Sequence, residues 1–519
     1  MITRKISLRH RVFTLIFSTF FVFEVSPSFA QNTLFELYRR KSDSTRVEFS
    51  NASALFKENG KYYQYVIACY TATTEGSVSF SHKGRQILSS AVKKGVNRYL
   101  LPVPAVDKPS AIKISAKLHN EAAKDYSFTV TPVKKWNIYL VQHTHTDIGF
   151  THPQSEVLAE QMRYIDYALD YCDQTDSMPA DAQFRWTCES AWVTKEYVLS
   201  RPASQVERLK RRIREGRIEV TGLSFNMAEI ADENLMYDFL HPLKTLKTAG
   251  IPVKTAMQDD VNGIAWCMPD YLKNTGIRYL SMGVNETRSI LPFDKPTTFW
   301  WESPSGERLL AFRSEHYMTA NFFKIEEASP DFGQRMLWYL SDLERKKYPF
   351  DRIAIQFSGY FTDNSPPSTI SSELIKKWNE KYEYPKLKLS VVSEFLEYVE
   401  KNHGTQLPVY RSAWLDWWTD GFASVSRETS EIRKVQNWKQ AGEGLLAMVS
   451  IFGTKLAPDI RTKMDHISEN ALFFSEHTVG ADESIHRPYS ENSTRQWLQK
   501  SAYAWEAVKK ITLLNEDAL

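Results

Sequence analysis

Between Trp136 and His403 the chain alternates between strand-like and helix-like segments, and this alternation constrains the fold more than any other feature. Strands are expected at residues 136–141, 184–187, 217–221, 255–259, 278–282, 309–313 and 352–357, and helices at 156–171, 206–215 and 270–276. Such alternation predicts an α/β fold, with a parallel sheet or an incomplete parallel β/α barrel and helices outside it. Functional sites of these folds lie at the carboxyl ends of the strands.

The segments before and after this region have different sequence patterns. Residues 62–70, 76–81 and 126–130 are expected to be strands of an N-terminal β-sandwich, with breaks at intervening glycines and prolines. Residues 428–452, 458–475 and 492–514 carry helical spacing, which predicts a C-terminal three-helix bundle. The expected division is therefore a signal peptide at 1–30, a β-sandwich at 31–134, a catalytic β/α domain at 135–423 and a helical bundle at 424–519.

The first thirty residues are typical of a secretory signal peptide. Basic residues precede a short apolar run at 12–25, and Ser28 and Ala30 supply the small residues of a cleavage site. We expect cleavage after Ala30 and a periplasmic or extracellular protein, with an uncleaved anchor helix as the weaker alternative. No other apolar run is long enough to span a bilayer, so stable membrane insertion is not expected.

The composition and net charge limit the classes of partner that this chain is expected to bind. The net charge of +3 gives no electrostatic argument for binding nucleic acid. The 14 Trp and 25 Tyr would suit stacking on sugars, although such residues also fill apolar cores. The four cysteines form no C-x-x-C pair, so a thiolate zinc site has no support. The sequence leaves the oligomeric state open.

The strand at 136–141 leads directly into His143, His145 and Asp147, which are spaced by two. Side chains alternate between the faces of a strand, so all three can project to one side at its carboxyl end. Imidazole nitrogen and carboxylate oxygen are ligands that zinc accepts. The alternative is a polar strand end whose histidines only satisfy local hydrogen bonds.

Three later stretches offer further ligands or catalytic groups, each with an ordinary alternative. Asp259 and Asp260 end a strand, and either could instead cap the helix that follows. His477 follows an apolar helix, where a histidine is also common as a cation at the helix C-terminus. Asp363 lies in a turn-rich loop after the strand at 352–357, where it could be a solvated turn residue.

Taken in order, these stretches resemble the catalytic part of glycoside hydrolase family 38, the zinc-dependent α-mannosidases, or a related bacterial branch. The family's first motif, a strand-end H-x-D-x-G-aromatic, matches His145, Asp147, Gly149 and Phe150. Its second motif matches Gln258, Asp260 and Gly263, and His477 stands where its helical region supplies a histidine. The segment 416–424 is similar to the aromatic run before that region. The resemblance covers roughly residues 136–488.

The resemblance implies a role for each matched residue. One Zn²⁺ would be held by His145, Asp147, Asp260 and His477, and Asp260 would also be the nucleophile of a retaining mechanism. Asp363 would be the acid/base. His143 would lie in the second shell or in the wall of the substrate pocket. Phe150, Trp192 and Trp418 are candidate surfaces for a sugar to stack on, although each would also suit the core. The implied function is that of an exported α-mannosidase-like hydrolase that removes terminal α-linked sugars from an oligosaccharide or glycan.

Departures from the family pattern lie around the substrate more than around the metal. Phe150 stands where tryptophan is usual, residues 261–264 read Val-Asn-Gly-Ile in place of Pro-Phe-Gly-His, and the loop of Asp363 also differs. The sugar therefore stays open. Two other functions are considered: a zinc-dependent polysaccharide deacetylase, which would direct a metal-bound water at an ester or amide, and a non-catalytic glycan-binding protein.

Overall fold

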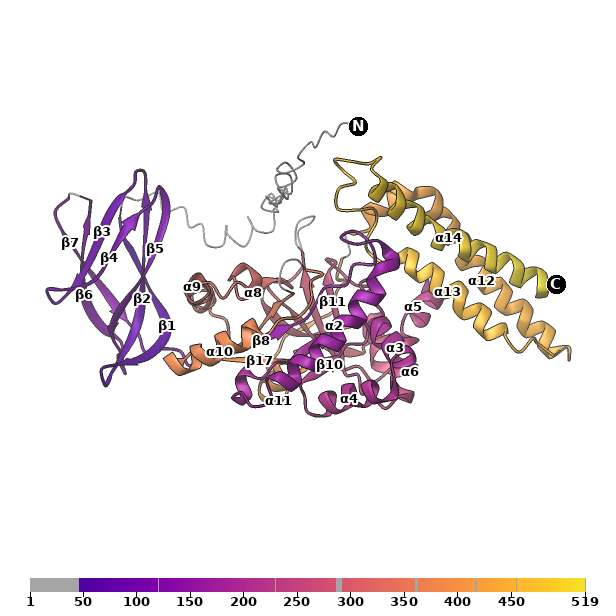
Figure 1. The fold of residues 1–519 in the computed structure, drawn as a ribbon, viewed down its shortest axis with the longest axis horizontal. Coiled ribbons are helices and arrows are strands. Elements are labelled where there is room, and N and C mark those ends of the chain that lie inside the picture. The colour runs from indigo at the N-terminus through magenta and orange to yellow at the C-terminus, as the bar shows by residue number, and fades with distance from the viewer. Residues whose placement is uncertain are drawn as a thin grey trace, which may run out of the picture.

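The structure is a computed structural model that describes residues 46–119, 121–228, 230–285, 292–359, 363–415, 418–453 and 455–518. Figure 1 shows N-terminal strands at one end, a central region of strands and helices, and long C-terminal helices at the other end. The expected signal peptide and its cleavage point after Ala30 lie outside the described residues. No helix within the described ranges is both long and apolar enough to cross a lipid bilayer.

The N-terminal region consists of two four-stranded antiparallel sheets, with strand orders β16-β1-β2-β5 and β4-β3-β6-β7. Buried residues from both sheets, among them Val66 and Leu101 from the first and Val78 and Ile114 from the second, form one apolar core. The strands are β1 (Glu48–Glu58), β2 (Lys61–Ala72), β3 (Gly76–His82), β4 (Arg85–Val92), β5 (Gly95–Pro104), β6 (Ser110–Leu118), β7 (Lys124–Val130) and β16 (Tyr382–Tyr384).

The strands of the central region fall into three sheets, ordered β15-β8-β17, β10-β9 and β11-β12-β14-β13-β18. Their bounds are β8 (Asn137–Gln142), β9 (Trp186–Cys188), β10 (Ile218–Val220), β11 (Thr255–Asp260), β12 (Tyr279–Val284), β13 (Thr297–Glu302), β14 (Arg308–Arg313), β15 (Arg352–Phe357), β17 (Lys386–Ser390) and β18 (Val409–Tyr410). Most neighbours are parallel. Isolated parallel bridges, His143 to Thr187 and Thr221 to Thr255, connect the three sheets. The predicted α/β class is confirmed, and the incomplete barrel stays a prediction.

Helices pack around these sheets (Figure 1). They are α2 (Gln154–Gln174), α3 (Ala191–Ser200), α4 (Ala203–Arg214), α5 (Glu233–Asp238), α6 (Pro242–Thr248), α7 (Met268–Asn274), α8 (Thr319–Phe322), α9 (Asp331–Arg345), α10 (Ile370–Lys381) and α11 (Val392–His403). Helix α2 buries Val157, Ile165 and Leu169, which recur on one face at helical spacing. Ser190 caps α3 by accepting a hydrogen bond from the Val193 amide at 3.4 Å.

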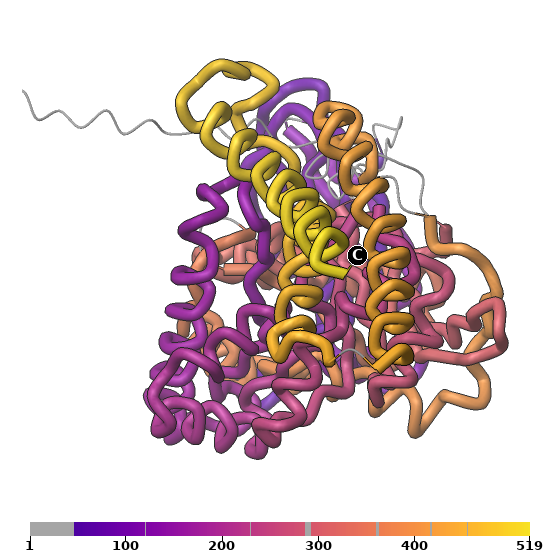
Figure 2. The backbone as a smooth tube through the Cα atoms, turned by 90° about the vertical axis from the view of Figure 1, so that its right-hand side faces the viewer, coloured from indigo at the N-terminus to yellow at the C-terminus, as the bar shows by residue number. Residues whose placement is uncertain are grey.

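Three long helices form the C-terminal region: α12 (Ser426–Ile451), α13 (Ile460–Ser475) and α14 (Glu491–Ala518). Helix α14 contacts both of the others, and Figure 2 shows the three running side by side. Ile467 and Ile511 of this region belong to the same apolar core as Trp186 and Val220 of the central sheets. The helices are therefore packed onto the central region through a shared core.

The ranges predicted for long elements agree with the structure to within a few residues. The helices expected at 458–475 and 492–514 correspond to α13 and α14, and the strand expected at 352–357 is β15. The domain boundaries stay predictions. All four cysteines are free.

Candidate active site

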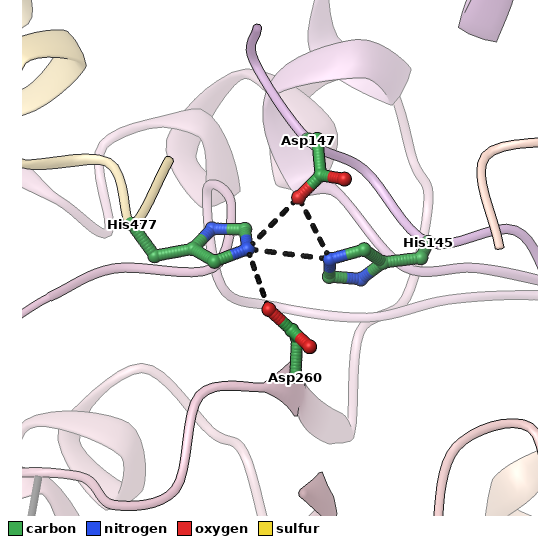
Figure 3. A group of neighbouring side chains, drawn as sticks. All are labelled: His145, Asp147, Asp260 and His477. Carbon is green, nitrogen blue, oxygen red and sulfur yellow. Dashed lines mark hydrogen bonds and ion pairs between the residues drawn. The ribbon is translucent and has the colours of Figure 1, made fainter. Parts of the chain in front are cut away.

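Four side chains from distant parts of the chain meet in one buried group: His145, Asp147, Asp260 and His477 (Figure 3). His145 and Asp147 follow strand β8, Asp260 is the last residue of β11, and His477 follows the end of helix α13. One ligand atom from each residue lies within 4.8 Å of the others. This group is named the four-residue centre below.

The spacing within the four-residue centre fits a four-coordinate metal ion. The Nε2 atoms of the two histidines are 3.3 Å apart, and Asp147 Oδ1 lies 3.0 Å from each of them. Asp260 Oδ2 lies 3.4 Å from His477 Nε2. A tetrahedral ion with bonds of about 2.0–2.1 Å separates its ligand atoms by about 3.3 Å. The donor set and its spacing are therefore compatible with a bound metal.

A carboxylate lies beside the Nδ1 atom of each imidazole ring and orients the ring. His145 Nδ1 lies 3.1 Å from Glu189 Oε1, and His477 Nδ1 lies 2.8 Å from Glu476 Oε1. A proton on each Nδ1 satisfies these acceptors and leaves Nε2 free to bind a cation, which is the arrangement typical of metal-binding histidines.

These two carboxylates and those of the four-residue centre favour the protonated form of both imidazoles when no cation is present. Burial alone would lower the pKa of His145, but Asp147 and Glu189 raise it well above 6.5. Burial acts in the same direction on His477, and Glu476, Asp147 and Asp260 outweigh it, so that this pKa is also raised well above 6.5. A metal ion would therefore displace protons from the centre as it binds.

Each carboxylate of the centre has its own support. Asn364 Nδ2 donates to Asp147 Oδ2 at 2.6 Å, and the Asp147 amide donates to Asn364 Oδ1 at 3.0 Å. Asp260 has a φ of 68°, in the left-handed region that costs a non-glycine residue energy. Its Oδ1 accepts hydrogen bonds from Asn285 Nδ2 at 2.6 Å and from the Tyr317 hydroxyl at 3.2 Å.

Asp363 lies next to this centre, as the sequence predicted for the loop after β15. The Tyr317 hydroxyl contacts its Oδ2 at 3.0 Å as well as Asp260, so a single hydroxyl lies between the two carboxyl groups. The Asp363 carbonyl accepts a hydrogen bond from the His145 amide at 2.8 Å, which fixes the loop against the end of β8. Burial, together with the charge of Asp147, raises the pKa of Asp363 to about 6.

His143 belongs to a second buried group with Glu189 and Asp259. Its Nδ1 lies 3.0 Å from Glu189 Oε2, and its Nε2 donates to the Tyr317 carbonyl at 3.1 Å. Burial alone would lower the pKa of His143, but the hydrogen bond to Glu189 and the nearby Asp259 raise it. His143 is fully buried behind the four-residue centre and shares Glu189 with His145.

The three aromatic candidates lie in different surroundings. The Trp418 ring is 6.2 Å from the His477 ring between centroids. Phe150 is 41% exposed, and Gln496 of α14 holds its backbone through hydrogen bonds to the amide and carbonyl. Trp192 is 8% exposed and packs edge-on against Phe473 at 5.0 Å. Sugar contacts by these residues stay predictions.

Five residues that support the centre were not predicted from the sequence. These are Glu189, Asn226, Tyr317, Asn364 and Glu476. Two of them carried a usable signal, because Glu189 directly follows β9 and Tyr317 follows β14, so both lie beyond carboxyl ends of strands.

The fold and the site together define an α/β protein with a buried His/Asp centre that is compatible with a metal. A family model described as "Glycosyl hydrolases family 38 N-terminal domain" matches residues 135–413. Because this match covers more than half of the chain, the chain belongs to glycosyl hydrolase family 38, which confirms the resemblance noted in the sequence and places it among the glycoside hydrolases. A search of curated proteins finds no match.

Two solved structures are compared, and the first of them supports the fold. An α-mannosidase from Enterococcus faecalis V583 is similar with a TM-score of 0.57 and 16% identity, over 74% of this chain and 42% of that one. A family 38 protein from Enterococcus faecalis has a TM-score of 0.47 and 13% identity, over 74% of this chain and 40% of that one. This chain therefore spans less than half the length of either structure.

Proposed function

We propose that the protein is an exported, zinc-dependent, retaining α-glycosidase, most similar in specificity to an α-mannosidase, that removes terminal α-linked sugars from glycans. The observation that carries this proposal is the four-residue centre with Asp363 beside it, in a chain of family 38. The basic and apolar N-terminal sequence supports export to the periplasm or the extracellular space. The α-mannosidase structure that shares the fold supports the choice of sugar.

His145, Asp147, Asp260 and His477 would hold the zinc ion, since they offer the two nitrogen and two oxygen donors of a catalytic zinc site. When bound, the ion would hold and orient the sugar hydroxyls that coordinate it. The remaining chemistry belongs to the side chains of the chain itself.

In the first step the Asp260 carboxylate attacks the anomeric carbon and forms a covalent glycosyl ester, while the bond to the leaving oxygen breaks and Asp363 gives its proton to that oxygen. In the second step Asp363 takes a proton from water, the water oxygen attacks the same carbon, and Asp260 leaves as a carboxylate. The raised pKa of Asp363 supports its role as the acid, because a carboxyl must be protonated before it can donate.

Tyr317 supports the retaining stereochemistry. Its hydroxyl lies 3.2 Å from Asp260 Oδ1 and 3.0 Å from Asp363 Oδ2. These oxygens are therefore at most about 6.2 Å apart, below the separation of about 6.5–9.5 Å that inverting enzymes need to fit a water molecule. The distance is compatible with the separation of about 5–5.5 Å found in retaining enzymes.

The proposal assigns sugar stacking to Phe150 and Trp418 only. Trp192 packs against Phe473, and His143 is enclosed by protein groups. The proposal also includes the finer description of the fold, in which an incomplete β/α barrel carries the site between a β-sandwich and a three-helix bundle.

Incubation of the purified protein with aryl α-mannosides, with and without a chelator, tests this function. We expect hydrolysis that the chelator abolishes and that added zinc restores. Acetate release from an acetylated glycan without glycosidic cleavage would favour a deacetylase. Glycan binding that persists in the Asp260→Ala variant, with no hydrolysis by the parent, would favour a binding protein.

Glu189→Gln is expected to weaken zinc binding by about 10–100-fold, because it removes the charge that orients His145 and pairs with His143. Competition with a chromogenic chelator measures this. Glu219→Gln is the matched control, since Glu219 is also a buried carboxylate but accepts hydrogen bonds from Thr255 and Ser393. An affinity unchanged in Glu189→Gln would contradict the role given to this carboxylate.

A further inference from the structure

The side chain of one lysine of helix α14 is buried in the protein interior beside the four-residue centre. Lys500 is 1% exposed, and its ammonium group donates three hydrogen bonds. The acceptors are the Phe473 carbonyl at 3.0 Å, the Glu476 carbonyl at 2.8 Å and Glu476 Oε2 at 3.0 Å. They belong to the last turn of helix α13 and to the residue directly before His477.

Glu476 joins this lysine to a candidate metal ligand. While Oε2 accepts from Lys500, Oε1 lies 2.8 Å from His477 Nδ1 and accepts from the Ile148 amide at 3.3 Å. Ile148 directly follows Asp147, so the same carboxylate contacts the segments that carry two of the four candidate ligands. Glu476 is fully buried, and its carboxylate forms an ion pair with Lys500 at 3.0 Å.

Lys500 also fixes the backbone before His477. Helix α13 ends at Ser475, and the carbonyls of the last helical turn have no partner within the helix. The ammonium group satisfies one of these, at Phe473, and its charge complements the negative end of the helix. One side chain therefore holds both the main chain and the carboxylate that place His477.

We propose that Lys500 is a positioning residue for the metal centre: acting through Glu476, it holds His477 in the geometry that binds zinc and so couples the docking of helix α14 to metal affinity. This inference rests on the proposed zinc site. Without the ammonium group, the buried Glu476 carboxylate would lose its ion pair with Lys500 and keep only the hydrogen bonds from Thr478 on Oε2, and movement of the carboxylate would release His477 Nδ1.

The chain offers a matched control in Lys439 of helix α12. This lysine is also buried, with its ammonium group 3.0 Å from Asp238 and 2.8 Å from Glu443. It likewise ties the C-terminal helices to the central region, but its partners do not contact a residue of the four-residue centre. A purely structural role for buried lysines would give both positions the same effect.

The test compares Lys500→Met with Lys439→Met in the full chain, using chelator competition for zinc affinity and thermal unfolding of the zinc-free protein for stability. We expect Lys500→Met to bind zinc at least about 10-fold more weakly than the parent, and Lys439→Met to bind it as the parent does. Both variants are expected to unfold at lower temperature when zinc-free.

A double-mutant cycle identifies the route of the effect. If Lys500 acts through Glu476, the loss of zinc affinity in Lys500→Met combined with Glu476→Gln is smaller than the two separate losses together. Should Lys500→Met not fold, Lys500→Gln replaces it with the same criteria. Parental zinc affinity in the Lys500 variant, or an equal loss in Lys439→Met, would overturn the inference. A parent that binds no zinc would instead overturn the proposed function itself.

Discussion

Asp363→Asn is expected to slow the hydrolysis of an aryl α-mannoside with a poor leaving group by about 10²–10⁴-fold, the contribution usual for general acid–base catalysis. Asparagine has the same shape as aspartate and leaves the backbone carbonyl that accepts from the His145 amide in place. It lacks the proton that would be given to the leaving oxygen. Steady-state kinetics on the variant and the parent measure the difference.

Zinc content and azide rescue distinguish a loss of acid catalysis from a general loss of folding or metal binding. The zinc content of Asp363→Asn should equal that of the parent, because Asp363 is not among the four candidate ligands. With an activated aryl α-mannoside whose leaving group needs no protonation, azide should restore turnover and yield an α-glycosyl azide, since azide needs no general base to attack the glycosyl ester of Asp260. A variant with parental activity would remove Asp363 from the mechanism.

The pH profile gives an independent check on the same residue. An acid must be protonated to act, so the activity of the parent should fall as the pH rises through the pKa of Asp363, which the structure raises to about 6. This alkaline limb should be absent from the azide-supported activity of Asp363→Asn. An unchanged alkaline limb in the variant would assign it to another group.

His477→Ala is expected to lose both the metal and the stability that the metal confers. The side chain supplies one of four candidate ligands, and it is the only one of the four that comes from the C-terminal helical region. At a free zinc concentration of 100 times Kd, a bound metal stabilises the folded state by about 2.7 kcal/mol, and the variant would forfeit this contribution. Metal analysis and thermal unfolding with and without zinc measure the two effects.

His466→Ala is the matched control for this experiment. His466 lies on the same helix, α13, but it is exposed and stands outside the four-residue centre. It should keep the zinc stoichiometry of the parent and its zinc-dependent gain in melting temperature. Full zinc stoichiometry in His477→Ala would contradict the ligand assignment.

Local patterns in the sequence placed three of the four candidate ligands, His145, Asp147 and Asp260, at strand ends, where the structure also has them. β11 and β15 were predicted within one residue of their observed bounds, because each contains a short apolar run and is followed within three residues by a glycine. Because functional sites of such folds lie at the carboxyl ends of strands, the residues after β8 and β11 were expected near one another, and the structure brings them together although the two strands belong to different sheets. The contribution of His477 came from the family resemblance, because nothing local links a helix end to a strand in another region.

The grouping of His143 with the metal ligands illustrates what alternation along a strand cannot predict. The spacing of His143, His145 and Asp147 suggested that all three face one side, but β8 ends at Gln142 and only an isolated bridge from His143 to Thr187 follows it. Beyond that point the period of two no longer applies. His145 and Asp147 therefore enter the four-residue centre, whereas His143 lies in the second buried group.

Residues that support the centre were harder to predict for a related reason. Tyr317 follows β14 in sequence, but its importance depends on where β11 and the loop of Asp363 place their carboxylates. β16 likewise joins the N-terminal sheet from residues 382–384, a pairing that only the tertiary fold determines. Such contacts arise from long-range packing and leave no periodic signal in the chain.

Proton NMR of the products of an aryl α-mannoside shows whether Asp260 and Asp363 act together in a zinc-dependent retaining hydrolysis, as we propose. With the protein at full zinc occupancy, we expect the α-anomer of the free sugar to form first and a chelator to stop its formation. Initial release of the β-anomer, or no hydrolysis of any α-glycoside at full zinc occupancy, would contradict the proposal.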